Sequence, residues 1–315
     1  MKNRIVLSVI TLYFISLFAS SCKKQTNEAE LDAKVQQHNT DAGNYKSELD
    51  QADNDINNSL SNTGLGKEGG SSPLCGVTID TSSISQKYIV YNFDGVTPCF
   101  SPSRTRSGKI KVQLTSGKRW GDVGSVITET FINYKVVRLS DNKSITLNGV
   151  KTYKNVNGNN WLGYLLGTTS LKFQERALNI QVTFDNGSTA TWNSARTAEL
   201  KYTPVNADPK IKYAYTTFKS NGDTTINGIN NVESWGVNRF GENFTSYYNA
   251  PIVSNDYCGL SRFNSGELVY KIQNNDFMFT LGLDQNGIPT TLNCAYGFKV
   301  TWTVGGNSKS VILSY

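Results

Sequence analysis

The chain has 315 residues, of which 38% are hydrophobic, 11% aromatic and 18% charged, and it carries a formal net charge of +6. Its single histidine, His38, excludes a Ser/His/Asp or Cys/His nucleophile system in the rest of the chain, together with zinc and iron sites built on histidines. The sequence contains no Gly-x-Ser-x-Gly turn, phosphate-binding glycine loop or Cys-x-x-Cys pair, so the common hydrolase and redox designs are excluded as well.

Residues 1–21 have the pattern of a bacterial lipoprotein signal peptide. Lys2 and Arg4 precede an apolar run over residues 5–18, and small residues lead directly to Cys22. A helix over this run rises only about 21 Å, whereas the core of a bilayer is about 30 Å thick, which argues against a membrane-spanning anchor. The sequence therefore predicts cleavage before Cys22 and a membrane tether through acyl chains on that residue.

Residues 22–72 are predicted to form a lipidated stalk. Apolar side chains recur between Leu31 and Ile56 at alternating spacings of four and three, which is typical of an amphipathic helix. His38 and Gly43 interrupt this stripe and favour a helix of moderate stability over a strong zipper. Residues 59–72 are rich in Gly and Ser and predict a flexible tether. The stalk is acidic, since residues 23–72 contain five basic and nine acidic side chains, whereas residues 73–315 contain 24 and 16.

From residue 73 onward the sequence predicts an all-β head of sandwich type in two related halves, 73–205 and 206–315. Alternation with period two and Asn-Gly turns predict strands and hairpins in both halves. Two short patterns occur in each half: a cysteine followed by Ser-Arg and Ser-Gly, and an Asp-containing turn before a cysteine. The alternative is that common turn residues recur without a structural relationship.

Four cysteines remain beside Cys22, an even number that is typical of an exported, oxidised protein. Three pairings are possible, and proximity favours Cys75 with Cys99 and Cys258 with Cys294. Free buried thiols are the alternative.

The chain resembles uncharacterised outer-membrane lipoproteins of the Bacteroidetes type. The resemblance is carried by Cys22-Lys23-Lys24, the acidic stalk, the Arg-Thr-Arg-Ser-Gly-Lys-Ile stretch after Cys99, and the Asn-Gly hairpin that leads to Thr191-Trp192-Asn193-Ser194 and to Arg196-Thr197. It implies an outer-membrane location, lipid-anchored, on the periplasmic face or the cell surface. It implies no activity.

A basic stretch is the main candidate for binding. Residues 95–121 contain no acidic side chain, and they include Arg104, Arg106, Lys109 and Lys111, with Trp120 near the end. Lys109 and Lys111 alternate with apolar residues, so both are predicted on one strand face. The alternative is an ordinary solvated sheet face. Trp161, Tyr164 and Trp235 lie among amide-rich residues, as aromatic side chains do in many sugar-binding sites. The alternative is that these aromatic side chains belong to the core.

Carboxylates could serve a glycosidase, but no spacing pairs any two of the candidates, which are Asp94, Glu129, Asp185, Glu199, Glu233, Glu242 and Asp284. The loops around Asp185 and Asp284 lack the spaced acidic set of a calcium loop. We therefore assign no catalytic residue, metal or cofactor. The predicted function is a non-enzymatic envelope lipoprotein whose head binds a glycan or a protein; nucleic acid is not the expected partner. The alternatives are a carboxylate-dependent glycan-degrading enzyme and a structural accessory of an outer-membrane assembly.

Overall fold

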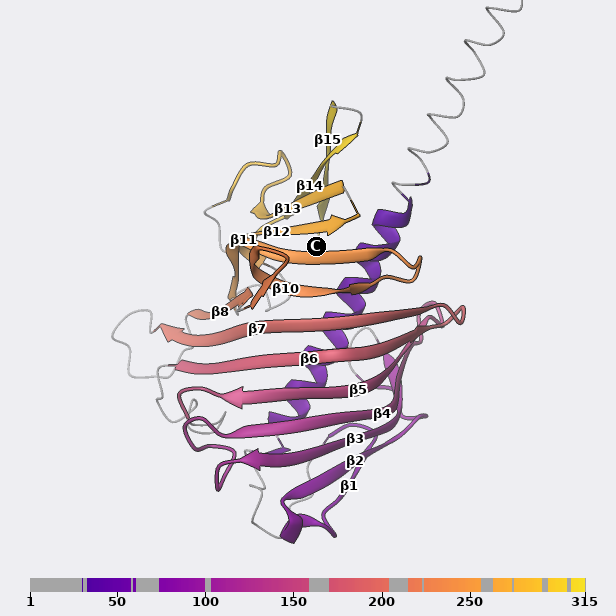
Figure 1. Cartoon of the computed structure of the whole chain (residues 1–315), viewed down its shortest axis with the longest axis vertical. Coiled ribbons are helices and arrows are strands. Elements are labelled where there is room, and N and C mark those ends of the chain that lie inside the picture. The colour runs from indigo at the N-terminus through magenta and orange to yellow at the C-terminus, as the bar shows by residue number, and fades with distance from the viewer. Residues whose placement is uncertain are drawn as a thin grey trace, which may run out of the picture. The chain divides into compact units, whose positions relative to one another are not determined.

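The computed structural model of the chain (Figure 1) describes residues 30, 33–57, 59–60, 74–99, 103–158, 170–203, 215–222, 224–255, 263–273, 275–290, 294–304 and 307–314. The chain divides into two compact units, Met1–Ser47 and Glu48–Tyr315. The described residues of the first unit are helical. The second unit contains the end of this helix and all the described strands.

The predicted helix is confirmed, because residues 33–57 are helical and include His38. Its last part, residues 48–57, belongs to the β-rich unit, although the sequence suggested a separate stalk as far as residue 72. Leu49, Ala52 and Ile56 are each only 1% exposed. Burial of these apolar side chains stabilises the unit, so the helical segment 48–57 is part of its core.

The strands are mostly long and follow one another through short turns. They are β1 (Val77–Asp80), β2 (Tyr88–Asp94), β3 (Arg104–Ser116), β4 (Val126–Arg138), β5 (Ser144–Asn155), β6 (Ser170–Phe184), β7 (Thr189–Thr203), β8 (Tyr215–Gly222), β9 (Thr224–Ile226), β10 (Ile229–Val237), β11 (Asn243–Asn255), β12 (Phe263–Ile272), β13 (Asn275–Leu283), β14 (Gly297–Val304) and β15 (Asn307–Ser314). A single turn of 3-10 helix, Ile84–Gln86, precedes β2.

The predicted all-β class is confirmed. The strands form one 15-stranded antiparallel sheet in the order β1 to β7 and then β10 to β15, with β8 beside β7 and β11 and with β9 beside β10. The two predicted halves meet where β7 pairs with β10, from Ser194 opposite Ser234 to Thr191 opposite Val237. One continuous sheet thus includes both predicted halves. Pairing with β10 satisfies backbone groups that would otherwise lie unpaired along the edge of β7.

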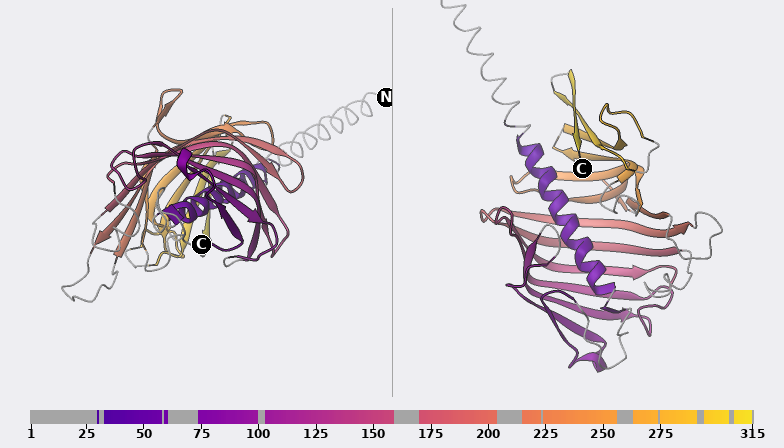
Figure 2. Two further views of the ribbon diagram at one scale, coloured as in Figure 1. Left: turned by 90° about the horizontal axis from the view of Figure 1, so that it is seen from below. Right: turned by 180° about the vertical axis from the view of Figure 1, so that it is seen from behind.

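Bulges bend the sheet toward the helical segment 48–57. A Cβ atom on Gly108 of β3 would lie 2.0 Å from the carbonyl oxygen of Asn133 on β4. Asn133 has a φ of 49°, and its amide donates to Asn148 Oδ1 at 2.7 Å. The arrangement recurs on β6, where Asn179 has a φ of 55° and donates to Asn193 Oδ1 at 2.8 Å. Such bulges increase local twist and bending, and Figure 2 shows the strands curving around the segment.

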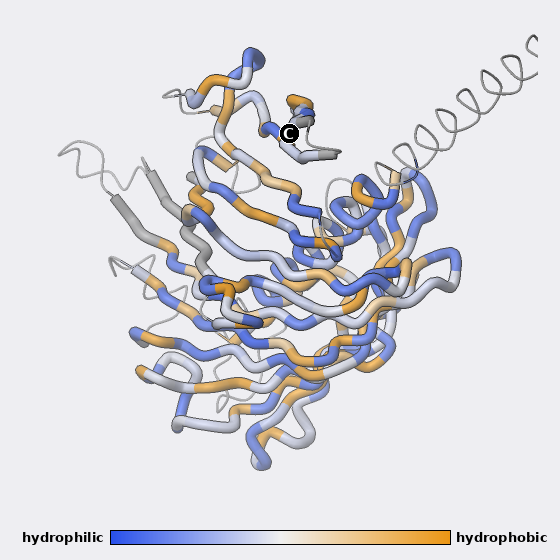
Figure 3. Tube along the Cα trace, turned by 45° about the horizontal axis from the view of Figure 1, so that its top comes forward, coloured by the Kyte–Doolittle hydropathy of each residue, from blue (hydrophilic) through white to orange (hydrophobic). Residues whose placement is uncertain are grey.

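The core lies on the inner face of the sheet, which we define as the face toward the helical segment 48–57. Its largest fully buried side chains include Trp192, Tyr91, Tyr134 and Phe131. Hydrophobic and hydrophilic residues are interspersed along the strands (Figure 3), as expected for strands with one buried and one solvated face. In the β12–β14 region, Tyr270 and Phe279 pack edge to face with ring centroids 5.5 Å apart.

The repeated sequence patterns have structural counterparts. Gly108 and Gly266 occupy bulged positions with φ of 86° and 132°, where a Cβ atom would meet backbone atoms of the neighbouring strand. Asp94 and Asp284 each accept backbone N–H groups two residues or more ahead, in turns that reverse the chain. The two patterns therefore mark a glycine bulge and an Asp-containing turn in each of the two parts of the sheet.

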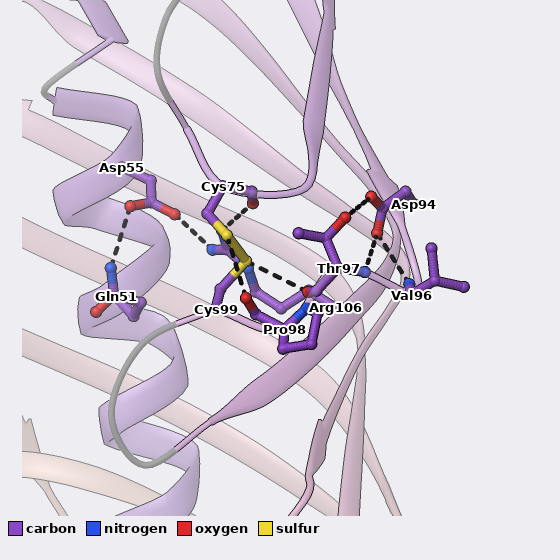
Figure 4. Close-up of a disulfide and its surroundings, with 9 residues drawn as sticks. All are labelled: Gln51, Asp55, Cys75, Asp94, Val96, Thr97, Pro98, Cys99 and Arg106. Carbon is purple, nitrogen blue, oxygen red and sulfur yellow. Dashed lines mark hydrogen bonds and ion pairs between the residues drawn. A yellow bond between two sulfur atoms is a disulfide. The ribbon is translucent and has the colours of Figure 1, made fainter.

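The predicted Cys75–Cys99 disulfide is confirmed and closes a loop with a sequence separation of 24 (Figure 4). Beside it, Asp94 holds the turn to Cys99 by accepting the amides of Val96 and Thr97 at 2.9 and 3.0 Å. Cys294 is also disulfide-bonded. Its predicted partner, Cys258, lies outside the described residues, so that pairing stays a prediction.

Candidate functional site: an outer basic face and a buried ionic seam

The predicted basic stretch divides between the two faces of β3. Arg104 and Arg106 point to the inner face, where Arg106 is 2% exposed. Lys109 and Lys111 point outward, as their alternation with apolar residues predicted; Lys109 is exposed, and the Lys111 ammonium lies 4.1 Å from the centroid of the Tyr88 ring. The four cations therefore do not form one surface.

Arg104 and Arg106 are bound to the chain's own helical segment. Arg104 forms an ion pair with Glu48, and Arg106 with Asp55. Figure 4 shows the guanidinium of Arg106 between Asp55 and the disulfide, where it also donates to the carbonyl oxygen of Cys75 at 3.0 Å. These arginines fix the helical segment to the first strands of the sheet.

Further buried charges continue this contact across β4 to β7. Lys151 pairs with Asp53 of the helical segment, and its Nζ lies 3.0 Å from Glu129 and 4.0 Å from Glu175. Arg196 pairs with Asp50 of the helical segment and lies 3.0 Å from Glu175. We call this whole set the ionic seam; it consists of Glu48, Asp50, Asp53 and Asp55 on the helical segment and of Arg104, Arg106, Glu129, Lys151, Glu175 and Arg196 on the strands.

Burial controls the protonation of the seam. Desolvation raises the pKa of Glu129 to about 8, against the opposing effect of Lys151. Desolvation likewise holds the pKa of Glu175 well above its usual range. Burial acts to lower the pKa of Lys151, but the charges of Asp53, Glu129 and Glu175 outweigh it and raise the pKa. Burial therefore favours the protonated forms of Glu129 and Glu175 beside Lys151.

The outward face of β3 to β6 carries positive charge alone. Strands β3 to β6 contain only two acidic residues, Glu129 and Glu175, and both point inward and are nearly fully buried. Basic side chains on the opposite face are exposed or half-buried. We call this surface the outer basic face; its cations are Lys109, Lys111, Lys135, Lys154, Lys172 and Arg176. Between them lie the exposed apolar residues Ile132, Val150 and Leu178, which are 43%, 45% and 50% exposed.

The predicted aromatic candidates do not form a sugar-binding platform within the described residues. Trp120 is 2% exposed, stacks near Tyr153 at 5.7 Å between centroids, and donates through Nε1 to Asn57 Oδ1 at 2.9 Å. Trp235 is half-buried within β10. Trp161, Tyr164 and the lipidation candidate Cys22 lie outside the described residues.

The candidate carboxylates have diverse surroundings. Asp94 and Asp284 are held in turns, Asp185 is exposed in the turn after β6, and Glu233 is buried and accepts from Ser246 Oγ at 2.9 Å. Glu199 and Glu242 are half-buried.

The ionic seam brings together residues that the sequence did not connect. No sequence motif points to Glu175 or Lys151, and Arg196 belongs only to the stretch that carries the resemblance. Each of the three falls at the same alternating positions as buried apolar neighbours on its strand. Single carboxylate oxygens of Asp50, Asp53 and Glu175 lie within 4.8 Å of one another. Lys151 and Arg196 already neutralise this group, so it is poorly suited to hold a metal cation.

A small cavity of about 380 Å³ lies elsewhere in the sheet, between the turn that joins β6 to β7 and the turn that joins β10 to β11. Its lining includes Ser188, Thr191, Val237, Asn238 and Arg239. The space is open to solvent, and its volume is near the lower limit for small-molecule sites.

The chain matches no protein-family model, and neither the curated proteins nor the solved structures contain a significant match. Within the described residues, none of the helical structure combines the length and apolar character needed to cross a bilayer.

Proposed function

We propose that the chain is a non-enzymatic lipoprotein of the cell envelope, anchored in the outer membrane through Cys22, whose β-rich unit binds an anionic glycan on the outer basic face. The observation that carries the proposal is the separation of charge across β3 to β6. All acidic residues of these strands point inward, and six cations remain on the outward face.

An extended basic face suits an extended anionic ligand. Each exposed ion pair contributes about 0.2 to 1 kcal/mol, so useful affinity requires several contacts with one polymer. Outward threonine, asparagine and glutamine side chains on the same strands supply hydrogen-bonding partners for hydroxyl groups. Binding of this kind weakens as salt concentration rises, because exposed charges are screened.

The test is binding of the purified full chain to a polyuronate, measured at two salt concentrations. We expect the triple variant Lys109→Ser, Lys111→Ser and Lys135→Ser to lose about tenfold in affinity or more, which corresponds to about 1.4 kcal/mol. A control variant changes the same number of lysines in the β12–β15 region, Lys271, Lys299 and Lys309, and should bind normally. Equal losses in the two variants, or no binding by the wild type, would refute the proposal.

A carboxylate-dependent glycan hydrolase is the second candidate. The Oε2 atoms of Glu129 and Glu175 lie 3.0 and 4.0 Å from the same Lys151 Nζ, so they are at most 7 Å apart and close enough to act on one substrate. Both lie beneath the helical segment, which would have to leave to admit a substrate. Release of reducing ends from the polyuronate, lost in Glu129→Gln and Glu175→Gln, would favour this candidate.

A further inference from the structure

We propose that the outer basic face binds an anionic glycolipid at a membrane surface, with its charged sugar groups on the cations and its hydrocarbon on a row of apolar side chains. We call this row the apolar ridge; it consists of Ile132, Val150 and Leu178. The inference rests on the proposed function and deepens it, because it identifies the anionic glycan as one that carries lipid.

The three side chains of the apolar ridge are neighbours on adjacent strands. Val150 of β5 lies opposite Leu178 of β6, and on its other side it lies opposite Thr130 of β4, two residues before Ile132. Cross-strand neighbours on one face have Cβ atoms about 5 Å apart, and diagonal neighbours about 7 Å apart. Single exposed apolar side chains are ordinary on a protein surface, whereas three neighbouring ones that are 43%, 45% and 50% exposed form a patch.

Bulges place the apolar ridge on the convex side of the sheet. Ile132 and Leu178 each precede the bulged asparagine of their strand, and Val150 follows Gly149, where the pairing register of β5 shifts. Since the bulges bend the strands toward the helical segment 48–57, the outward side of each bend is convex (Figure 2). A convex apolar surface can reach into a membrane surface without contact by the rest of the sheet.

Cations lie next to the apolar ridge. Lys109 of β3 lies opposite Ile132, and Lys111 is the next outward residue on the same strand. Lys135 is exposed on β4, beyond the bulge that follows Ile132. Exposed aliphatic side chains with cations around them match a ligand that combines hydrocarbon with negative charge. A polyuronate supplies the charge but leaves the apolar ridge in water.

Polar side chains beside the apolar ridge favour a glycolipid over a phospholipid that lacks sugar. Thr130 lies between Lys111 and Val150 in the register of β3, β4 and β5. Gln181 is exposed on β6, opposite Asn148 of β5. Hydroxyl and amide groups at these positions suit the hydroxyl groups of a sugar.

The experiment is hydroxyl-radical labelling of the full chain on three kinds of vesicle. They consist of phosphatidylcholine alone, of phosphatidylcholine with a minor fraction of lipid A, which is an acylated and phosphorylated glucosamine disaccharide, and of phosphatidylcholine with phosphatidylglycerol at the same charge. We expect labelling of the apolar ridge to fall about fivefold on lipid A vesicles relative to the other two, because inserted side chains are shielded from water. Ile288 and Leu313, which are 60% and 42% exposed in the β13–β15 region, are internal controls and should be labelled equally on all three.

Substitution tests the apolar ridge directly. We expect the triple variant Ile132→Ser, Val150→Ser and Leu178→Ser to lose about tenfold in affinity for lipid A vesicles relative to phosphatidylcholine vesicles. A control variant removes the same three side-chain types from exposed positions in the β13–β15 region, Ile288→Ser, Val311→Ser and Leu313→Ser, and should keep the wild-type ratio. The labelling of the wild type tests the same contact without depending on the folding of either variant.

The outcomes separate this inference from the proposed function. The ridge variant should keep polyuronate binding, whereas the triple lysine variant should lose both the polyuronate and lipid A vesicles. Equal labelling of the apolar ridge on phosphatidylcholine and lipid A vesicles, equal protection by phosphatidylglycerol, or equal losses in the ridge and control variants would overturn the inference, even where the polyuronate binds. Protection of the ridge without any polyuronate binding would refute the proposed function as stated and support the glycolipid contact.

Discussion

Lys151 is the residue on which the buried charges converge. Its ammonium group is completely buried and faces three carboxylates, those of Asp53, Glu129 and Glu175. Three ionised acids beside one cation in a medium of low dielectric would repel one another, so the folded state favours protonation of Glu129 and Glu175. The two glutamates thereby make the stability of the protein depend on pH.

We expect the free energy of unfolding to fall as pH rises from 5 to 8. Because the pKa of Glu129 is raised to about 8 from 4.5, its contribution is fully present below the unfolded pKa and is lost as pH rises through the folded pKa. Urea denaturation should show Glu129→Gln losing about 3 kcal/mol less than the wild type over this interval. Glu199→Gln, outside the ionic seam, is the matched control and should keep the wild-type slope. An identical slope in Glu129→Gln would contradict this account.

At the scale of the strands, glycine and asparagine determine the bend of the sheet. Gly108 has a φ of 86°, and its Cα lies so close to β4 that a Cβ atom would be 2.0 Å from the Asn133 carbonyl oxygen. A glycine is needed here for two reasons: the left-handed conformation and the close approach of backbone. Without the bulge, β3 and β4 would be straighter and the inner face would contact less of the helical segment 48–57.

We expect Gly108→Ala to destabilise the protein by about 3 kcal/mol or more, because it combines backbone strain with a steric clash. Gly124→Ala is the control. Gly124 has a φ of 76°, but a Cβ atom added there would meet no heavy atom within 4 Å, so only the strain of about 1 kcal/mol remains. Thermal unfolding of both variants compares them directly. Equal losses would show that the close approach at Gly108 is unimportant.

At the scale of the whole β-rich unit, one helical segment and the inner face of one curved sheet form a common core and a common set of ion pairs. The segment 48–57 supplies Leu49 and Ile56 to the core and four acids to the ionic seam. Removal of these acids would leave Arg104, Arg106 and Lys151 without them in a desolvated site, which costs about 3 to 5 kcal/mol for each broken buried pair. The segment is therefore a structural part of the unit that carries the proposed binding surfaces.

Truncation tests this dependence. We expect a chain that begins at Glu48 to unfold cooperatively, with native near-ultraviolet circular dichroism. A chain that begins at residue 61 should lose that signal and bind a hydrophobic dye, because the inner face of the sheet is uncovered. If the shorter chain unfolds with the same midpoint as the longer one, the helical segment is dispensable and the assignment of the core is wrong.

The sequence alone determined the features that depend on local pattern. Alternation predicted the all-β class and the outward direction of Lys109 and Lys111, spacing of apolar residues predicted the helix, and proximity predicted the Cys75–Cys99 bridge. The same alternation places Arg104 and Arg106 at the same parity as the buried Ile110 on β3. This parity indicates that both arginines point inward, whereas their charge alone suggested an exposed binding surface.

Only the tertiary structure decided which distant residues meet. The segment 48–57 and Lys151 are about a hundred positions apart, and no local pattern specifies that Asp53 will reach Lys151. The single continuous sheet depends on the pairing of β7 with β10 and on bulges whose bend accumulates over many strands. The apolar ridge depends on the same bulges. These features follow from long-range packing, in which burial of the whole inner face outweighs the preferences of any single segment.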